Sequence, residues 1–177
     1  MENKLLLDAV YEWERSDPDR VYMTQPLGNG EVIDYTWGQT MDQARRMAAH
    51  LRSLDLPPHS NIAMISKNCA HFIIAELAVW MAGHATVALY PTLNADTVAY
   101  ILEHSEARLL FVGKLDGWEE MAKGVPDALP KIAFLLAPPR MRHPHACCSA
   151  GINAMRTSGR AATRPSGAAS VGCVRTM

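Results

Sequence analysis

The chain has 177 residues, 49% of them hydrophobic, and its 17 Lys and Arg nearly balance its 18 Asp and Glu. Its longest apolar stretch, residues 69–83, is interrupted by His71 and Glu76 and is shorter than the roughly 20 residues that cross a bilayer, which argues against a transmembrane segment. The opening Met-Glu-Asn-Lys does not resemble a secretory signal, so we expect a cytoplasmic location and reduced thiols.

The first three predicted elements are a helix, a hairpin and a second helix. Apolar residues recur at helical spacing over residues 4–15, and Asp17-Pro18 is expected to end that helix. Residues 21–25 and 31–35 read as short strands around Gly28-Asn29-Gly30, which we interpret as a hairpin turn rather than a phosphate loop because no helix follows directly. Thr36 is predicted to cap a helix that stops near Pro57-Pro58.

From residue 60 onward the pattern alternates between strands and helices. Four runs are rich in aliphatic and aromatic residues on both faces, as in parallel strands covered on two sides: Ile62 to Ile65, Thr86 to Tyr90, Arg108 to Val112 and Ile132 to Leu136. Helices are expected between them at Cys69 to Ala82, Asp96 to His104 and Asp116 to Lys123. This βαβαβαβ order predicts an α/β fold with a partial doubly wound parallel sheet. Gly83 suits the end of the first of these helices, and Asn94 suits the cap of the second.

Ligands of such sheets bind beyond the carboxyl ends of the strands. Those ends are predicted at Ser66-Lys67-Asn68, Pro91-Thr92-Leu93-Asn94 and Gly113-Lys114. Neither Gly-x-Gly-x-x-Gly nor Gly-x-x-x-x-Gly-Lys-Ser/Thr occurs anywhere in the sequence, and Lys67 and Lys114 are expected to be solvated. These loops therefore carry no chemical signature of their own.

The reactive side chains outside these loops favour structural roles. His71, His84 and His104 lie on or beside predicted helices, where a hydrogen-bonded structural histidine is commoner than a catalyst. Cys69 opens a helix, a position that can lower a thiol pKa, but a buried inert thiol is the simpler interpretation.

Several segments together resemble the opening of the adenylate-forming acyl-CoA synthetases. They are Tyr35-Thr36-Trp37, the helix from Met41 to Leu54, Ile62-Ala63-Met64-Ile65-Ser66-Lys67-Asn68, Gly83, and Ala88-Leu89-Tyr90-Pro91-Thr92-Leu93 to Tyr100-Ile101-Leu102. The resemblance covers residues 4 to about 137, and Leu89-Tyr90-Pro91-Thr92-Leu93 is most similar to the long-chain fatty acid branch. Ala88 stands where the family often has Pro.

The resemblance implies a ligase that uses ATP and Mg²⁺ to form an acyl-adenylate and then transfers the acyl group of a fatty acid to CoA. The family's phosphate loop, adenine, ribose and catalytic-lysine motifs match no position here convincingly, so we assign no catalytic, cofactor-binding or metal residue and no cofactor to this chain itself. Thr157-Ser158-Gly159 and Pro165-Ser166-Gly167 mimic the phosphate loop only superficially, because the spacing is wrong and Ser166 replaces the lysine.

Charge separates the last part of the chain from the rest. Residues 1–139 carry eleven Lys and Arg against eighteen Asp and Glu, a net charge of −7, whereas residues 140–177 carry six Arg and no acid, a net charge of +6. This tail has few large apolar groups, so we expect it to be disordered and unrelated to the family, and its composition looks like translation in a shifted frame.

Two functional interpretations of the tail compete with that hypothesis. Six Arg without acids suit nucleic acid or an anionic membrane, but no aromatic side chains are interleaved for stacking, so we expect no nucleic-acid partner. His143, His145, Cys147 and Cys148 offer zinc ligands, although their spacing differs from the usual one.

The sequence and the resemblance therefore predict that residues 1–139 are the N-terminal portion of the large domain of a synthetase and that residues 140–177 are an Arg/Ala/Ser/Gly-rich tail. The leading hypothesis is an N-terminal fragment of a long-chain fatty acid–CoA ligase that is inactive alone and self-associates through surfaces the complete enzyme would cover. The alternative is a non-catalytic binding module that uses the sheet or the Arg-rich tail.

Overall fold

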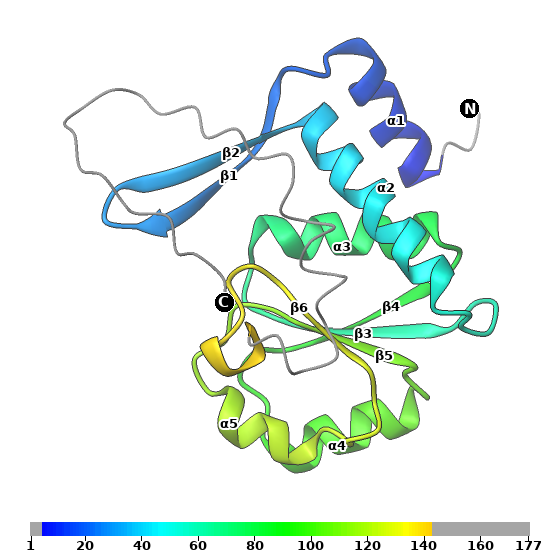
Figure 1. Cartoon of the computed structure of the whole chain (residues 1–177), viewed down its shortest axis with the longest axis vertical. Helices are drawn as coiled ribbons and strands as arrows, with labels where there is room; N and C mark the ends of the chain where they lie inside the picture. Colours follow the sequence, from blue (N-terminus) through cyan, green and yellow to red (C-terminus); the bar gives the residue numbers. More distant parts are fainter. Residues whose placement is uncertain (1–4, 143–177) are drawn as a thin grey trace, which may run out of the picture.

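The computed structural model describes residues 5–142 and shows a parallel sheet with helices on both faces, flanked by a hairpin and an N-terminal helix (Figure 1). In chain order the elements are α1 (Leu6–Ser16), β1 (Val21–Gly28), β2 (Glu31–Thr36), α2 (Trp37–Ser53), β3 (Asn61–Ile65), α3 (Ala70–Met81), β4 (Ala85–Leu89), α4 (Ala95–His104), β5 (Leu109–Val112), α5 (Trp118–Met121), the 3-10 turn η1 (Ala122–Gly124), β6 (Lys131–Ala133) and the 3-10 turn η2 (Pro139–Arg142).

The sheet has four parallel strands in the order β4-β3-β5-β6. The chain moves outward from β3 through α3 to β4, and then returns through α4 past β3 to β5. Two crossovers of the same hand that run in opposite directions along a sheet place their helices on opposite faces. α3 therefore lies on one side of the sheet, and α4 and α5 lie on the other (Figure 1). The predicted α/β fold with a partial doubly wound sheet is confirmed.

Alternating side chains of the strands build two separate cores. Ile62 and Met64 of β3 face α2 and α3, and they join a cluster that includes Phe111 and Phe134. Ala63 of β3 faces the opposite way and joins a cluster with side chains of α4 and α5. Successive residues of a strand point to opposite faces, so one short strand supplies both cores at once.

Local signals for the turns and caps are confirmed. The Thr36 hydroxyl accepts a hydrogen bond from the Gln39 amide at 3.2 Å, and the Gln39 side chain accepts one from the Thr36 amide at 3.1 Å. Asn94 caps α4 through Thr97 at 2.8 Å. Gly83 has φ +80°, a left-handed conformation that favours glycine after a helix.

Three predicted elements differ from the structure. β4 is an outer strand whose Ala85 and Ala88 are exposed, so it is not covered on both faces as its composition suggested. The predicted helix over 116–123 is only one turn of α-helix followed by η1, between Gly117 and Gly124. β6 ends at Ala133, after which the chain turns.

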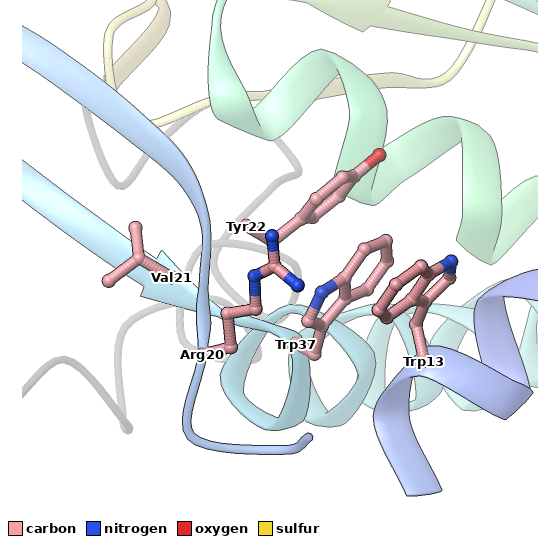
Figure 2. Close-up of a pocket in the computed structure, with 5 residues that line it drawn as sticks. All are labelled: Trp13, Arg20, Val21, Tyr22 and Trp37. Carbon is pink, nitrogen blue, oxygen red and sulfur yellow. The ribbon is translucent and has the colours of Figure 1, made fainter. Parts of the chain in front are cut away.

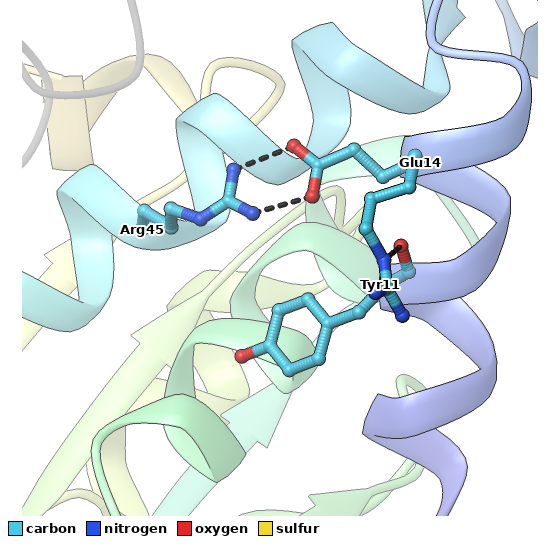
Figure 3. Close-up of polar contacts among 4 residues, drawn as sticks. Tyr11, Glu14 and Arg45 are labelled. Atoms are coloured by element: carbon cyan, nitrogen blue, oxygen red, sulfur yellow. Dashed lines mark hydrogen bonds and ion pairs between the residues drawn. The ribbon is translucent and has the colours of Figure 1, made fainter.

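Helix α1 packs on α2 through a two-pronged ion pair. Arg45 donates to both carboxylate oxygens of Glu14, one of them at 2.6 Å, and its guanidinium lies 5.9 Å from the ring centre of Tyr11 (Figure 3). Glu14 is largely shielded from solvent, and hydrogen bonding to Glu14 raises the pKa of Arg45 further. The parallel geometry of the two bonds orients α1 on α2.

The junction between η1 and α4 tolerates no side chain at Gly124. A β-carbon there would overlap the carbonyl oxygen of Ala95 and lie 2.7 Å from its carbonyl carbon, and both atoms belong to backbone that opens α4. Gly124→Ala should therefore lower the free energy of unfolding by about 1–3 kcal/mol through overpacking.

Gly117→Ala is the matched control, because nothing lies within 4 Å of the β-carbon added at Gly117 and its φ is negative. Urea unfolding should give a clearly lower midpoint for Gly124→Ala than for Gly117→Ala. Equal midpoints would contradict the close approach.

Candidate functional site

The candidate site lies at the carboxyl ends of β3 and β5, where the chain reverses direction across the sheet. In doubly wound folds this switch point is where ligands bind. Two of the three predicted ligand loops, Ser66-Lys67-Asn68 and Gly113-Lys114, meet here. The Lys67 amide donates to the Lys114 carbonyl at 2.8 Å, and the Lys114 amide donates to the Ser66 hydroxyl at 3.0 Å.

These hydrogen bonds occupy backbone groups that a ligand at the switch point would otherwise use. Ser66 is buried, and its hydroxyl also donates to the Lys67 carbonyl at 2.6 Å. A β-carbon at Gly113 would overlap Ser66 and lie 2.6 Å from the Phe134 ring, so only glycine fits between them. Backbone amides that cradle a phosphate in other doubly wound proteins are used here within the protein.

Neither predicted lysine forms an anion site. Lys67 Nζ is paired with the Asp116 carboxylate, and both side chains are substantially exposed, so their pairing is weak in energy. Lys114 is exposed at the surface. The third loop follows β4, and its polar side chain, Asn94, caps α4. The structure thus brings two of the three predicted loops together. Their lysine side chains do not converge on a point where a phosphate could bind.

Helix α3 begins beside this switch point and is capped from the hairpin. Gln25 of β1 is only 4% exposed, and its side-chain oxygen accepts a hydrogen bond from the Ala70 amide at 2.9 Å. Its amide nitrogen donates to the Pro26 carbonyl at 2.8 Å. Sequence reasoning missed this contact because it joins residues 45 positions apart and no local pattern announces it.

The first turn of α3 also carries a buried histidine. His71 is 2% exposed and lies between Tyr35, in an edge-on contact at 5.8 Å, and Phe134, at 6.2 Å. Burial lowers the pKa of His71 to about 4, so the ring is neutral at neutral pH. Its Nδ1 has no hydrogen-bond partner among residues 5–142, which differs from the hydrogen-bonded histidine expected from the sequence.

The remaining predicted candidates lie apart from one another. His84 follows α3, and its pKa is lowered by burial and then by the nearby His59. His104 stacks on Tyr100 at 5.5 Å. Cys69 precedes α3, is half-buried rather than fully buried, and has its sulfur 3.6 Å from the Ser66 hydroxyl. No geometry here pairs a nucleophile with a base in the part of the chain that the structure describes.

A shallow groove of about 170 Å³ lies elsewhere, between α1 and β1 (Figure 2). Its aromatic rings already stack on one another: Tyr22 lies 3.7 Å from Trp37, and Trp37 lies 6.1 Å from Trp13. The Arg20 guanidinium covers Trp13 at 5.4 Å. The stack fastens the α1–β1 connection to α2 and leaves no gap of the width that a bound ring needs.

Residues 5–142 lack the side-chain clusters of a metal site and the long apolar helix of a membrane span. This part of the chain contains no cluster of three or more His, Cys, Asp or Glu side chains that could bind a metal ion. It also contains no helix with the length and hydropathy of a membrane span. The proposed zinc ligands His143, His145, Cys147 and Cys148, and the phosphate-loop mimic at 157–167, lie outside the described residues.

The family model described as AMP-binding enzyme matches residues 10–147 of the chain. The chain belongs to the AMP-binding enzyme family. Among its curated relatives is the long-chain-fatty-acid–CoA ligase FadD15 of Mycobacterium bovis, which is 31% identical over 127 residues, 72% of this chain and 21% of that protein. Another is the peroxisomal acetate/butyrate–CoA ligase AAE7 of Arabidopsis thaliana, which is 37% identical over 97 residues, 53% of this chain and 17% of that protein.

Solved structures share the fold of this AMP-binding chain. The crystal structure of IdnL1 superimposes with a TM-score of 0.64 at 20% identity, over 76% of this chain and 27% of that one. A benzoate CoA ligase from Burkholderia xenovorans LB400 gives 0.58 at 23% identity, over 73% and 26%. The chain spans about one fifth of the length of the curated relatives named above.

The loops at the switch point do not fit the triphosphate of the ATP that the family resemblance implies. A triphosphate needs convergent amides or cations, and here the switch-point amides are bonded internally while Lys67 is paired. No catalytic step is therefore assigned to these residues.

The hydrogen bond from the Ala70 amide to Gln25 should contribute to the stability of the hairpin. Gln25→Ala removes the acceptor of the Ala70 amide and leaves a buried donor without a partner, which should cost about 1–3 kcal/mol of unfolding free energy. The hairpin amides should also exchange faster in hydrogen-exchange measurements, because the cap fastens β1 to α3.

Thr24→Ala is its control on the same strand, since Thr24 donates to Asp34 at the exposed face of the hairpin. This change should cost less than about 1 kcal/mol, in keeping with an exposed hydrogen bond. A larger loss for Thr24→Ala than for Gln25→Ala would show that the cap does not fasten the hairpin.

His71 makes the stability of the protein dependent on pH. Its folded pKa of about 4 lies below the ordinary value of 6.5, so the contribution of the neutral ring is present above pH 6.5 and is lost as the pH falls toward 4. Wild type should lose up to about 3 kcal/mol more than His71→Phe over this interval. Urea unfolding at a series of pH values measures the difference.

His104→Phe is the matched control for the substitution itself, because His104 is an exposed histidine at the end of α4. Glu76, whose pKa is raised by burial, contributes with the opposite sign in all three proteins and cancels in the comparison. Parallel curves for wild type and His71→Phe would contradict a buried neutral histidine.

Proposed function

We propose that this chain is the N-terminal portion of a ligase that activates a long-chain fatty acid with ATP and transfers the acyl group to CoA. The observation that carries the proposal is the AMP-binding family match over residues 10–147, combined with coverage of only about one fifth of the curated relatives named above. The chain's own role is to supply the first sheet of the large domain, and the reacting groups come from elsewhere.

The closed switch point supports the view that this portion is inactive alone. Adenylate formation depends on charges and donors positioned around phosphates before the reaction begins. At the switch point the amides of Lys67, Gly113 and Lys114 are bonded within the protein, and Lys67 is paired with Asp116. We infer that binding ATP, Mg²⁺ and CoA requires residues beyond this part of the chain.

The proposed specificity for a long-chain fatty acid is based on the two curated relatives named above. FadD15 is named as a long-chain-fatty-acid ligase and matches 72% of the chain, whereas AAE7 is named for acetate and butyrate and matches 53%. Broader coverage favours the long-chain class for the parent reaction. The chain spans only about one fifth of these relatives, so the test must supply the rest of an enzyme.

We also propose that the family portion ends near residue 139 and that residues 140–177 are unrelated to it. The support is composition: acidic residues stop at Asp127, and residues 140–177 contain six Arg and no Lys. The family match runs to residue 147, and η2 carries Met141 into the core beneath α4 and α5, so the boundary falls in or just after this turn.

The full chain should fail to exchange pyrophosphate into ATP with any fatty acid, because it lacks positioned phosphate contacts. The M. bovis FadD15 relative serves as the active control in the same assay. Acid-dependent exchange by the chain, in a preparation free of host synthetase, would overturn the proposal that it is inactive alone.

A chimera tests the family role separately. Residues 10–139 replace the aligned segment of FadD15, and thioester formation is measured with palmitate, butyrate and acetate. Activity with palmitate is the expected result. A chimera that folds but uses only the short acids would overturn the long-chain assignment, and a folded chimera without any activity would overturn the proposed scaffold role.

A further inference from the structure

One edge of the parallel sheet has no neighbouring strand among residues 5–142. β4 is the outermost strand on that side, and it pairs only with β3. The Ala85 amide donates to the Ser60 carbonyl at 3.0 Å, so Ala85 faces β3. Because the backbone groups of a parallel strand alternate in direction, the N–H and C=O groups of Thr86 and Ala88 face away from the sheet.

This edge lacks the features by which proteins usually prevent strand pairing. Residues 83–95 contain no Asp, Glu, Lys or Arg, and the strand itself has no proline and no bulge. Ala88 is exposed and small, so no side chain shields the backbone. Unprotected, uncharged edges of this kind pair readily with another strand.

The other edges are protected. β6 has only three residues, begins with Lys131, and is followed by the chain that turns into η2. The hairpin carries Asp34 and Glu31 on β2, and Pro26 on β1. β4 is therefore the edge, among the described strands, that is both regular and free of charge.

We propose that β4 pairs in antiparallel fashion with β4 of a second copy of this chain. One register pairs all the outward-facing N–H and C=O groups of Thr86 and Ala88. In it, Thr86 lies opposite the second copy's Ala88, and the two-fold axis passes beside Val87. Each Thr86–Ala88 pair exchanges two backbone hydrogen bonds, so the two four-stranded sheets join into one.

A second copy fits this edge because the strand is complementary to itself. A two-fold axis places each side chain opposite its symmetry mate or a near neighbour, and like charges at such an axis would repel. Here no charge approaches another within the strand, and the net charge of the chain is only −1. The interface is small, so we expect a dissociation constant on the order of 100 µM. This inference does not rest on the proposed function.

The first test places a charge on the edge. Ala88→Lys should shift the full chain from a concentration-dependent dimer to a monomer in sedimentation equilibrium, weakening association on the order of tenfold or more. Ala49→Lys is the matched control, because Ala49 is also an exposed alanine but lies on α2. Its association should equal that of wild type. Monomeric wild type up to several hundred micromolar, or equal effects of the two variants, would overturn the proposal.

A second test reads the register directly and does not depend on the lysine variant. Directly opposed residues at the two-fold axis have α-carbons about 4.5 Å apart, within disulfide reach. With Cys147, Cys148 and Cys173 changed to Ser, Val87→Cys should form a disulfide-linked dimer under mild oxidation. Ala85→Cys should not, since its mate lies about 13 Å further along the strand. Cross-linking of Ala85→Cys, or of neither variant, would overturn the antiparallel pairing.

Discussion

Burial of β3 on both faces and both edges is the constraint on which the rest of the structure depends. Ile62, Ala63, Met64 and Ile65 are all fully inaccessible to solvent, and the strand pairs with β4 on one side and β5 on the other. Its alternating side chains anchor two cores, so α2 and α3 must cover one face while α4 and α5 cover the other. A polar residue at any of these four positions would disturb a core that two helices share.

The same strand determines why the switch point is closed. β3 and β5 are nearest neighbours, and Gly113 allows the loops that follow them to approach closely. The Lys67 amide then donates to the Lys114 carbonyl, and the Lys114 amide donates to the Ser66 hydroxyl. Backbone donors satisfied in this way are unavailable to a phosphate. The arrangement stabilises the sheet at the place where many doubly wound proteins bind a ligand, which is consistent with a scaffold role for this part of an AMP-binding enzyme.

The N-terminal segments attach to this sheet through apolar side chains packed against the first core and through polar and aromatic contacts. Gln25 fastens the hairpin to α3, Glu14 and Arg45 join α1 to α2, and the ring stack of Trp13, Trp37 and Tyr22 holds the connection between them. α1 has no fully buried residue, although Leu7, Val10 and Tyr11 pack against that core, so the directional contacts add to a partly buried apolar face. The buried, neutral His71 lies beneath the hairpin strand that carries Tyr35.

Local sequence determined the order and type of the elements, the caps at Thr36 and Asn94, the turn at Asn29-Gly30 and the family membership, because each rests on neighbouring residues or on ordered motifs. Tertiary structure alone decided which strand is an edge, so β4 looked like a covered strand although Ala88 is exposed. It also decided that Gln25 caps a helix 45 residues away and that the His71 ring is buried without a partner for Nδ1 among the described residues. Strand order, burial and pairing across the chain arise from packing between distant segments, and hydrophobic periodicity reports only which faces are apolar, not what lies against them.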